Sequence, residues 1–269
     1  MSCNKTCTHP TDYPTDMTDA EWDLIAPYVA PDPKIGSPRD VCMRCVVNAL
    51  FYLVKTGCQW RMLPNNFPNY GTVYHHFRRW SADGTLEQIA HDLRRQVRRD
   101  AGRDPEPSRG IVDSQSAPTA EAGGEIDFDA HKQIKGRKRF IITDTMGLIL
   151  TLLVTHAAVS DTASAADLEQ RLGPAPRLAD LLTDQGFKAT FRQVWAARRG
   201  ITVTTARRVS TLFQVVPTRW IVERTFGWLS MYRRLQADYE YHCGQSETMV
   251  WIAHLRLLLK RRTGRKDYV

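Results

Sequence analysis

Apolar residues recur at helical spacing through the first hundred positions of the chain. Thr18 followed by Glu21 forms a capping box, which predicts the start of a helix, and Gly57 is typical of a helix end. The expected helices cover about 18–28, 37–57, 72–82 and 86–99. The pattern therefore predicts a small all-helical domain over residues 18–101, preceded by a loose lead-in over residues 1–17.

The pattern changes after a proline-containing linker over residues 102–109. Short β-type runs form a hairpin at Asp144–Gly147 and then alternate with helical runs. The expected strands are 110–113, 140–143, 148–155, 178–183 and 201–205, and the expected helices are 161–172, 188–199 and a long one from about Pro217. This order predicts a mixed α/β sheet over residues 110–255, followed by a basic tail over residues 256–269.

Composition narrows the function classes. The 269 residues are 42% hydrophobic, which excludes wholesale disorder, and the longest apolar run is far shorter than the roughly 18 residues that a membrane span needs. The polar amino terminus lacks the apolar core of a secretory signal, so we expect a cytoplasmic protein without a membrane partner. The 37 Lys and Arg outnumber the 29 Asp and Glu, and they cluster, which favours nucleic acid as the partner over a merely soluble basic chain.

The third predicted helix carries side chains suited to DNA contact. It presents Tyr74, His75, Arg78 and Arg79 after a preceding helix and turn, an order compatible with a helix-turn-helix reader. The alternative is a helical bundle whose basic face is merely solvated. We expect this helix to contact DNA.

The cysteines allow two interpretations. Cys42-x-x-Cys45 has a spacing compatible with zinc, and Cys3, Cys7 and His9 could complete a site. However, Cys42 and Cys45 fall within an apolar helical run, where positions i and i+3 share a buried face. Small core cysteines are therefore favoured over a metal site.

Two predicted strands end in an aspartate. Ile-Val-Asp113 and Leu-Thr-Asp184 each place a carboxylate where an apolar strand leaves the core, which is where open α/β sheets bind ligands. If the strands are neighbours, the two like charges converge and need a cation, for which Mg²⁺ with its oxygen ligands is suited. Two unrelated aspartates that serve turns explain the pattern equally well.

A third carboxylate lies in the helix that follows Pro217. One face of this helix carries Arg219, Glu223 and Arg234, while an apolar stripe occupies another face. An ordinary ion pair between Arg219 and Glu223 would account for this spacing. A metal carboxylate with arginines that hold phosphate nearby is the functional interpretation.

Taken together, these motifs resemble those of the DDE transposases of the bacterial insertion-sequence class, family five, over nearly the whole chain. The segments that carry the resemblance are Thr-Gly-Cys-Gln-Trp-Arg-Met-Leu-Pro64, Thr-Val-Tyr-His-His-Phe-Arg-Arg-Trp80, Asp-Ser-Gln-Ser116, Lys-Gly-Arg-Lys-Arg139, Thr-Asp-Gln-Gly-Phe187 and Arg-Trp-Ile-Val-Glu-Arg-Thr-Phe-Gly-Trp-Leu229. The chain departs from the family pattern at Val216, where a tyrosine is expected, and at Ser230, where a basic residue is expected. Arg233 or Arg234 would take over the second role.

The resemblance implies an RNase H-like catalytic domain in which Asp113, Asp184 and Glu223 bind Mg²⁺, with Mn²⁺ as a substitute. The implied reaction is cleavage of insertion-sequence ends and transfer to target DNA by in-line attack, carried out at the nucleoid by protomers that associate on double-stranded DNA. In the second half of the chain, the expected DNA contacts are Lys135, Arg137, Lys138, Arg139, Arg219, Arg233 and Arg234. Two alternatives stay open, namely a DNA-binding regulator with an inactive triad and a metal-dependent nuclease without strand transfer.

Overall fold

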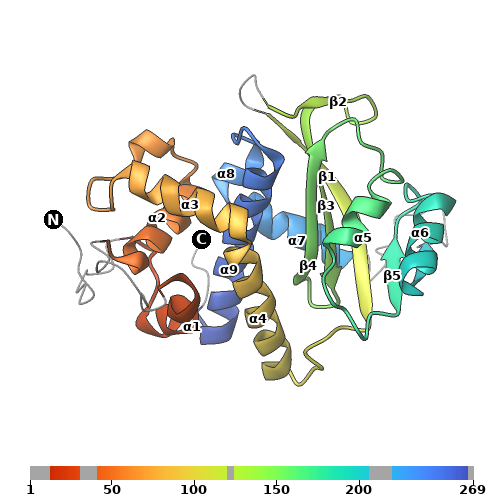
Figure 1. Ribbon diagram of the computed structural model, residues 1–269, viewed down its shortest axis with the longest axis horizontal. Helices are drawn as coiled ribbons and strands as arrows, with labels where there is room; N and C mark the ends of the chain where they lie inside the picture. The colour runs from red at the N-terminus through yellow and green to blue at the C-terminus, as the bar shows by residue number, and fades with distance from the viewer. Residues whose placement is uncertain (1–12, 31–40, 120–123, 206–219, 266–269) are drawn as a thin grey trace. The chain divides into compact units, whose positions relative to one another are not determined.

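The computed structural model describes residues 13–30, 41–119, 124–205 and 220–265, which form two compact units (Figure 1). The helical unit contains the described residues up to Asp100 together with Tyr232–Leu235 and the described residues from Thr248 onward. The sheet unit contains the described residues between Ala101 and Met231 and the segment Gln236–Glu247. The helical unit is thus discontinuous in sequence. None of the described helices is long and apolar enough to cross a membrane.

The described residues of the amino-terminal region contain the four α-helices that the sequence predicts, in the predicted order. They are α1 (Asp19–Val29), α2 (Met43–Thr56), α3 (Tyr70–Asp83) and α4 (Thr85–Asp100). A 3₁₀ helix outside the prediction, η1 (Trp60–Met62), lies between α2 and α3. The capping box forms, since the Glu21 amide donates to Thr18 Oγ1 at 3.2 Å and the Thr18 amide donates to Glu21 Oε2 at 2.8 Å. Gly57 ends α2 with a φ of 72°, as predicted. The predicted start of α2 at residues 37–40 lies outside the described residues.

The helical unit ends with α8 (Arg233–Gln236) and most of α9 (Cys243–Thr263). The sequence-based boundaries differ here. Met17, from the predicted lead-in, is buried, and so are Arg256 and Lys260, from the predicted basic tail. Arg256 donates to the backbone carbonyl of Thr15. Described residues of the predicted lead-in and of the predicted tail therefore belong to this unit, because these side chains are buried in it.

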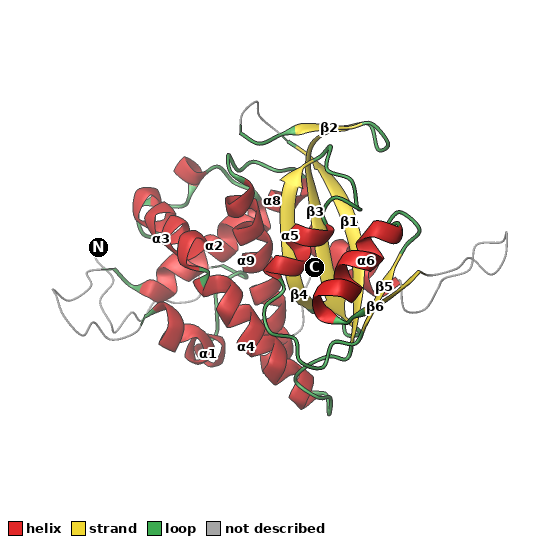
Figure 2. Cartoon of the chain, turned by 45° about the vertical axis from the view of Figure 1, so that its right-hand side comes forward, coloured by secondary structure: helices red, strands yellow, loops and turns green. Residues whose placement is uncertain are grey.

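The described residues of the sheet unit form six strands, whose arrangement can be followed in Figure 2. They are β1 (Arg109–Pro118), β2 (Asp127–Asp129), β3 (Ile134–Asp144), β4 (Ile149–His156), β5 (Asp180–Thr183) and β6 (Thr202–Thr205). The order is β2-β3-β1-β5-β6, with β4 also paired to β3. The pairs β1–β3, β2–β3 and β3–β4 are antiparallel, and β1–β5 and β5–β6 are parallel. This arrangement confirms the predicted mixed sheet.

The hairpin between β3 and β4 forms where the sequence predicts it. Asp144 Oδ1 accepts hydrogen bonds from the amides of Met146 and Leu148 at 2.8 and 2.9 Å, and Gly147 adopts a φ of 79°. Asp144 thus serves the turn.

Helices cover both faces of the sheet (Figure 1). On one face, α5 (Ala165–Arg171) and α6 (Ala189–Arg199) pack onto a core that includes Val112, Phe140 and Leu181. On the other face, α7 (Trp220–Ser230) packs against β1 and β3. Because side chains alternate along a strand, the neighbours of Val112 and Leu181 in sequence point toward the α7 face.

Candidate functional site

Asp113 and Asp184 occupy equivalent positions of two adjacent parallel strands. In the β1–β5 ladder, Arg109 pairs with Asp180 and Ile111 pairs with Leu182. Asp113 and Asp184 each lie two residues further on, so they continue this register, with Asp184 just beyond the end of β5. Alternation from Val112 and Leu181 assigns both positions to the α7 face of the sheet. The sequence-based expectation of neighbouring parallel strands is therefore met for the two strands themselves.

Backbone amides fix both carboxylates locally. The Ser114 amide donates to Asp113 Oδ1 at 2.8 Å, and the Gly186 amide donates to Asp184 Oδ1 at 2.9 Å. Both aspartates are partly buried. Each side chain is thus oriented by the turn of the chain that immediately follows it.

A further carboxylate, Asp161, connects the segments that follow the two aspartates. Its Oδ1 accepts a hydrogen bond from Ser114 Oγ at 3.0 Å and lies 2.8 Å from the Nζ of Lys138, a side chain only 9% exposed. A Cβ atom at Gly186 would lie 2.7 Å from Asp161 Oδ2 and 3.1 Å from Asp184 Oδ1. The bare Gly186 therefore lets Asp161 approach Asp184, and Lys138 compensates the negative charge. Sequence reasoning missed this role, because it took Asp161 only as the start of the helix predicted over 161–172, whereas Ser164 is the residue that precedes α5.

Glu223 lies on the exposed side of α7. The opposite side of the helix is fixed to the β3–β4 hairpin, where Thr225 Oγ1 donates to the carbonyl of Gly147 at 2.9 Å and Arg224 donates to the carbonyl of Met146 at 3.2 Å. Within the described residues, no group of three His, Cys, Asp or Glu side chains is placed to hold a metal ion. The structure therefore aligns Asp113 with Asp184 but does not bring Glu223 into one cluster with them.

The donor chemistry of these residues nevertheless fits a hard divalent cation. Asp113 and Asp184 offer carboxylate oxygens at the carboxyl end of a parallel strand pair, and α7 carries a third carboxylate on a helix that packs against β1. Mg²⁺ commonly uses only one or two protein carboxylates and completes its shell with water and phosphate oxygens. Two aligned aspartates therefore suffice as a starting site.

The predicted DNA-contact residues divide into two groups by burial. His75, Arg78 and Arg79 on α3 are exposed, and Tyr74 is half-buried against Trp60 at a ring-centroid distance of 4.9 Å. Lys135 on β3 and Arg233 on α8 are also exposed. Arg219 lies outside the described residues.

The other predicted DNA contacts, Arg137, Lys138, Arg139 and Arg234, are buried, which corrects the expectation for them. Arg137 donates to Asp238 Oδ1 at 2.8 Å, and burial lowers the pKa of the Arg139 guanidinium, which nearby Asp238 opposes. Arg234 donates to the carbonyl of Cys58. These cations are bound within the protein, so they are not presented to DNA.

Of the two cysteines at zinc-compatible spacing, Cys42 is half-buried and Cys45 is buried. A hydrogen bond with Cys42, together with burial, raises the pKa of the Cys45 thiol. Cys3, Cys7 and His9 lie outside the described residues.

Comparison with known proteins bears on both parts of the chain. A family model described as "Transposase DDE domain" matches residues 104–258, and one described as "Putative transposase of IS4/5 family" matches residues 17–90. A Burkholderia cepacia protein described as "Putative transposase for insertion sequence element IS402" is 30% identical over 116 residues. That match covers 39% of this chain and 54% of the relative, so it spans about half the relative's length. Because the DDE model matches more than half of the chain, the protein belongs to the DDE transposase family, of the IS4/5 type.

Proposed function

We propose that this protein is a transposase that binds the ends of an insertion sequence and carries out metal-dependent DNA strand cleavage and strand transfer. The observation that supports this most is the alignment of Asp113 with Asp184 on adjacent parallel strands in a chain of the DDE family. The reaction is an in-line phosphoryl transfer in two steps. Water attacks a phosphodiester at the transposon end, the P–O3′ bond breaks, and the leaving oxygen takes up a proton to become a free 3′-hydroxyl. That 3′-hydroxyl then attacks a phosphodiester of the target and displaces the target strand's own 3′-oxygen, which leaves as a hydroxyl.

In this proposal Asp113, Asp184 and Glu223 hold divalent metal, Mg²⁺ with Mn²⁺ as a substitute. When bound, such ions supply charge stabilisation for the attacking and leaving oxygens. Asp113, on the central strand β1, would hold the metal together with Asp184, and Glu223 would supply a third carboxylate from α7. The Ser114 and Gly186 amides keep Asp113 and Asp184 oriented before substrate arrives, which reduces the reorganisation needed during reaction.

Double-stranded DNA, as transposon ends and target, is the proposed partner. The exposed cations of α3, Arg78 and Arg79, together with Lys135 and Arg233, supply charge that suits phosphate contacts. Moving a DNA segment requires both of its ends to be held together, so we expect protomers to associate on the DNA, at the nucleoid.

The test uses the full-length protein and duplex DNA that carries the inverted repeats flanking its gene. Asp113→Asn, Asp184→Asn and Glu223→Gln should each abolish cleavage and joining in Mg²⁺ while DNA affinity stays near that of the wild type. Asp167→Asn, which neutralises an exposed carboxylate on α5, is the matched control and should stay active.

The other possible outcomes would change either the assigned site or the assigned function. Joining that persists in Glu223→Gln would exclude this residue from the triad. Cleavage without joining would indicate a nuclease, and DNA binding without either would indicate a regulator. Mixing Glu223→Gln with active protein should reduce joining more steeply than the active fraction, and a linear decline would show that single protomers act alone.

A further inference from the structure

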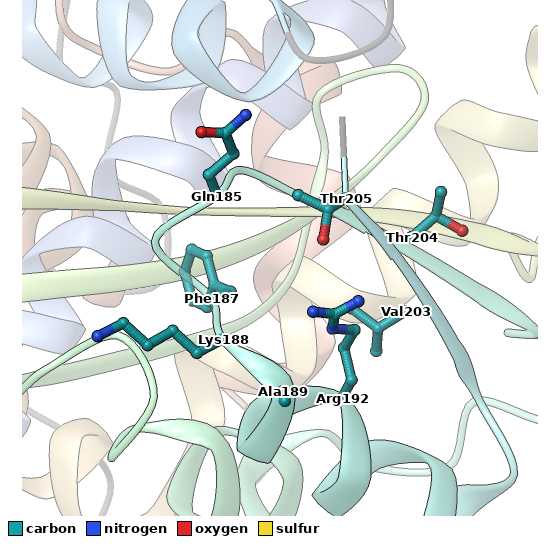
Figure 3. Close-up of a pocket in the computed structure, with 8 residues that line it drawn as sticks. All are labelled: Gln185, Phe187, Lys188, Ala189, Arg192, Val203, Thr204 and Thr205. Atoms are coloured by element: carbon teal, nitrogen blue, oxygen red, sulfur yellow. The ribbon is translucent and has the colours of Figure 1, made fainter. Parts of the chain in front are cut away.

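A pocket of about 610 Å³ lies at the carboxyl ends of β5 and β6, beside the first turn of α6 (Figure 3). Its lining includes the side chains of Gln185, Phe187, Lys188, Arg192 and Thr205. Gln185 directly follows Asp184 in the chain, so the pocket adjoins one of the proposed metal carboxylates. Open α/β sheets bind their ligands at this edge, which makes the pocket a candidate for holding part of the substrate.

Among the described residues that line the pocket, no carboxylate compensates its positive charge. Lys188 is the N-cap residue of α6, Arg192 lies four residues further on within the helix, and both are exposed. Neither side chain forms an ion pair within the described part of the chain. Two like charges that line one pocket repel each other, so an anion bound between them would stabilise the arrangement.

The basic residues at the other end of α6, in contrast, are paired with a carboxylate. Arg198 and Arg199 contact the carboxylate of Glu169 at 3.1 and 2.6 Å. These two arginines connect α6 to α5 and have a structural partner. Lys188, just before α6, and Arg192, in its first half, are therefore the cations at this end of the helix that remain available to a ligand.

A hydroxyl adds a neutral polar group to the pocket. Thr205 Oγ1 is buried and has no hydrogen-bond partner among the described residues. Figure 3 shows this hydroxyl and the guanidinium of Arg192 pointing toward one another within the pocket. A buried hydroxyl without a partner is costly, and an oxygen of a bound ligand would satisfy it.

We propose that this pocket binds a backbone phosphate of the DNA strand next to the phosphodiester that reacts, with Lys188 and Arg192 as the charged contacts and Thr205 as a neutral hydrogen-bond donor. The proposal rests on the proposed function, because it takes DNA as the substrate. It assigns these residues to positioning the strand relative to Asp184, whose side chain is held by the turn that leads into the pocket.

The test measures how the affinity of the full-length protein for a fluorescein-labelled duplex of arbitrary sequence changes with salt. Measurements by fluorescence anisotropy in Ca²⁺ should give a log–log slope that is smaller by about 1.8 in Lys188→Gln/Arg192→Gln, since each lost phosphate contact removes about 0.9. At 50 mM salt, this corresponds to an affinity loss of roughly tenfold per contact. Thr205→Val should weaken binding about threefold to tenfold with an unchanged slope, because a neutral donor releases no counterion.

Arg198→Gln is the matched control, because it removes one charge from the same helix while Arg199 keeps Glu169 paired. It should leave the slope unchanged. An unchanged slope in the double variant, or an equal loss per charge in the control, overturns the phosphate site while leaving the transposase proposal intact if wild-type protein still cleaves and joins. A wild-type protein that neither binds nor cleaves DNA overturns both.

Discussion

Arg137→Met separates the structural role of the basic run on β3 from the DNA-binding role that its sequence indicates. The Arg137 side chain is fully buried and donates hydrogen bonds to Asp238 Oδ1, Ser246 Oγ and three backbone carbonyls. All of these partners except the Glu125 carbonyl follow α8, so Arg137 joins β3 to that part of the chain. The substitution should therefore destabilise the sheet unit and leave the phosphate contacts of the protein unchanged.

The magnitude follows from what the substitution leaves behind. Removing one member of a buried ion pair costs about 3–5 kcal/mol, because the remaining charge loses its partner. Here Arg139 still lies 4.0 Å from Asp238 Oδ2 and compensates part of that charge, so the cost should fall near the lower end, about 3 kcal/mol. With a urea m-value of about 1–3 kcal/mol/M, the midpoint should fall by roughly 1–3 M.

The assay is urea unfolding followed by circular dichroism, combined with the salt dependence of DNA affinity at a temperature where the variant is folded. Lys135→Met is the matched control, since it removes the same charge from an exposed position of the same strand and should change stability by less than about 0.5 kcal/mol. A wild-type urea midpoint for Arg137→Met together with a salt slope reduced by about 0.9 would refute the structural reasoning.

Two more predictions concern the carboxylates and the core of the helical unit. Gly186→Ala should weaken Mn²⁺ binding about 10–100-fold in calorimetric titrations, because the added Cβ would displace Asp161 and Asp184. Gly173→Ala is the control, since a Cβ there would have no atom within 4 Å, and it should bind Mn²⁺ like the wild type. Equal Mn²⁺ affinities for the wild type and both variants would count against the Asp161 contact. Burial lowers the pKa of His254 to about 3, so the unfolded chain binds the additional proton as the pH falls below about 6.5. The helical unit should thus lose stability on acidification between pH 6.5 and 3, by up to about 1.4 kcal/mol per pH unit. His254→Gln should make the urea midpoint of this unit depend less steeply on pH. The same steepness in His254→Gln as in the wild type would contradict the role of His254.

Local signals in the sequence predicted local structure well. The capping box of Thr18 and Glu21, the helix end at Gly57 and the turn at Asp144 each depend on residues within a few positions, so the sequence contains the whole cause. The helix bounds shifted by a few residues, and β1 extends to Pro118, beyond the predicted end at Asp113. That extension comes from pairing with β3, which no local pattern could show.

The burial of the basic residues on β3 could not be predicted from their clustering in the sequence. Arg137 and Arg139 belong to a basic run that reads as a solvated surface, yet β3 pairs with both β1 and β4, and the partner that compensates the charge, Asp238, is about a hundred positions away. One signal of the burial was available in the sequence: the basic run continues directly into the apolar residues Phe140 and Ile142, which are buried. A strand that continues into a buried apolar segment is typical of the interior of a sheet. The same limit applies to the last helix, α9. The sequence pattern assigned residues 248–255 to the sheet domain and residues 256–269 to a basic tail, whereas the described residues from Thr248 onward belong to the helical unit.

The candidate site depends both on local sequence signals and on long-range strand pairing. The strand ends at Asp113 and Asp184 were visible in sequence, but their alignment requires the β1–β5 register, in which the separation of the two aspartates equals that of the paired residues Arg109 and Asp180. A slip of one residue in β5 would move Asp184 to the face of the sheet covered by α5 and α6, because side chains alternate. Leu181 fixes the register against that slip, since it is fully buried in the core on that face. The hydrophobic core therefore determines on which face the carboxylate lies, so a substitution that loosens Leu181 should impair metal binding without touching a carboxylate.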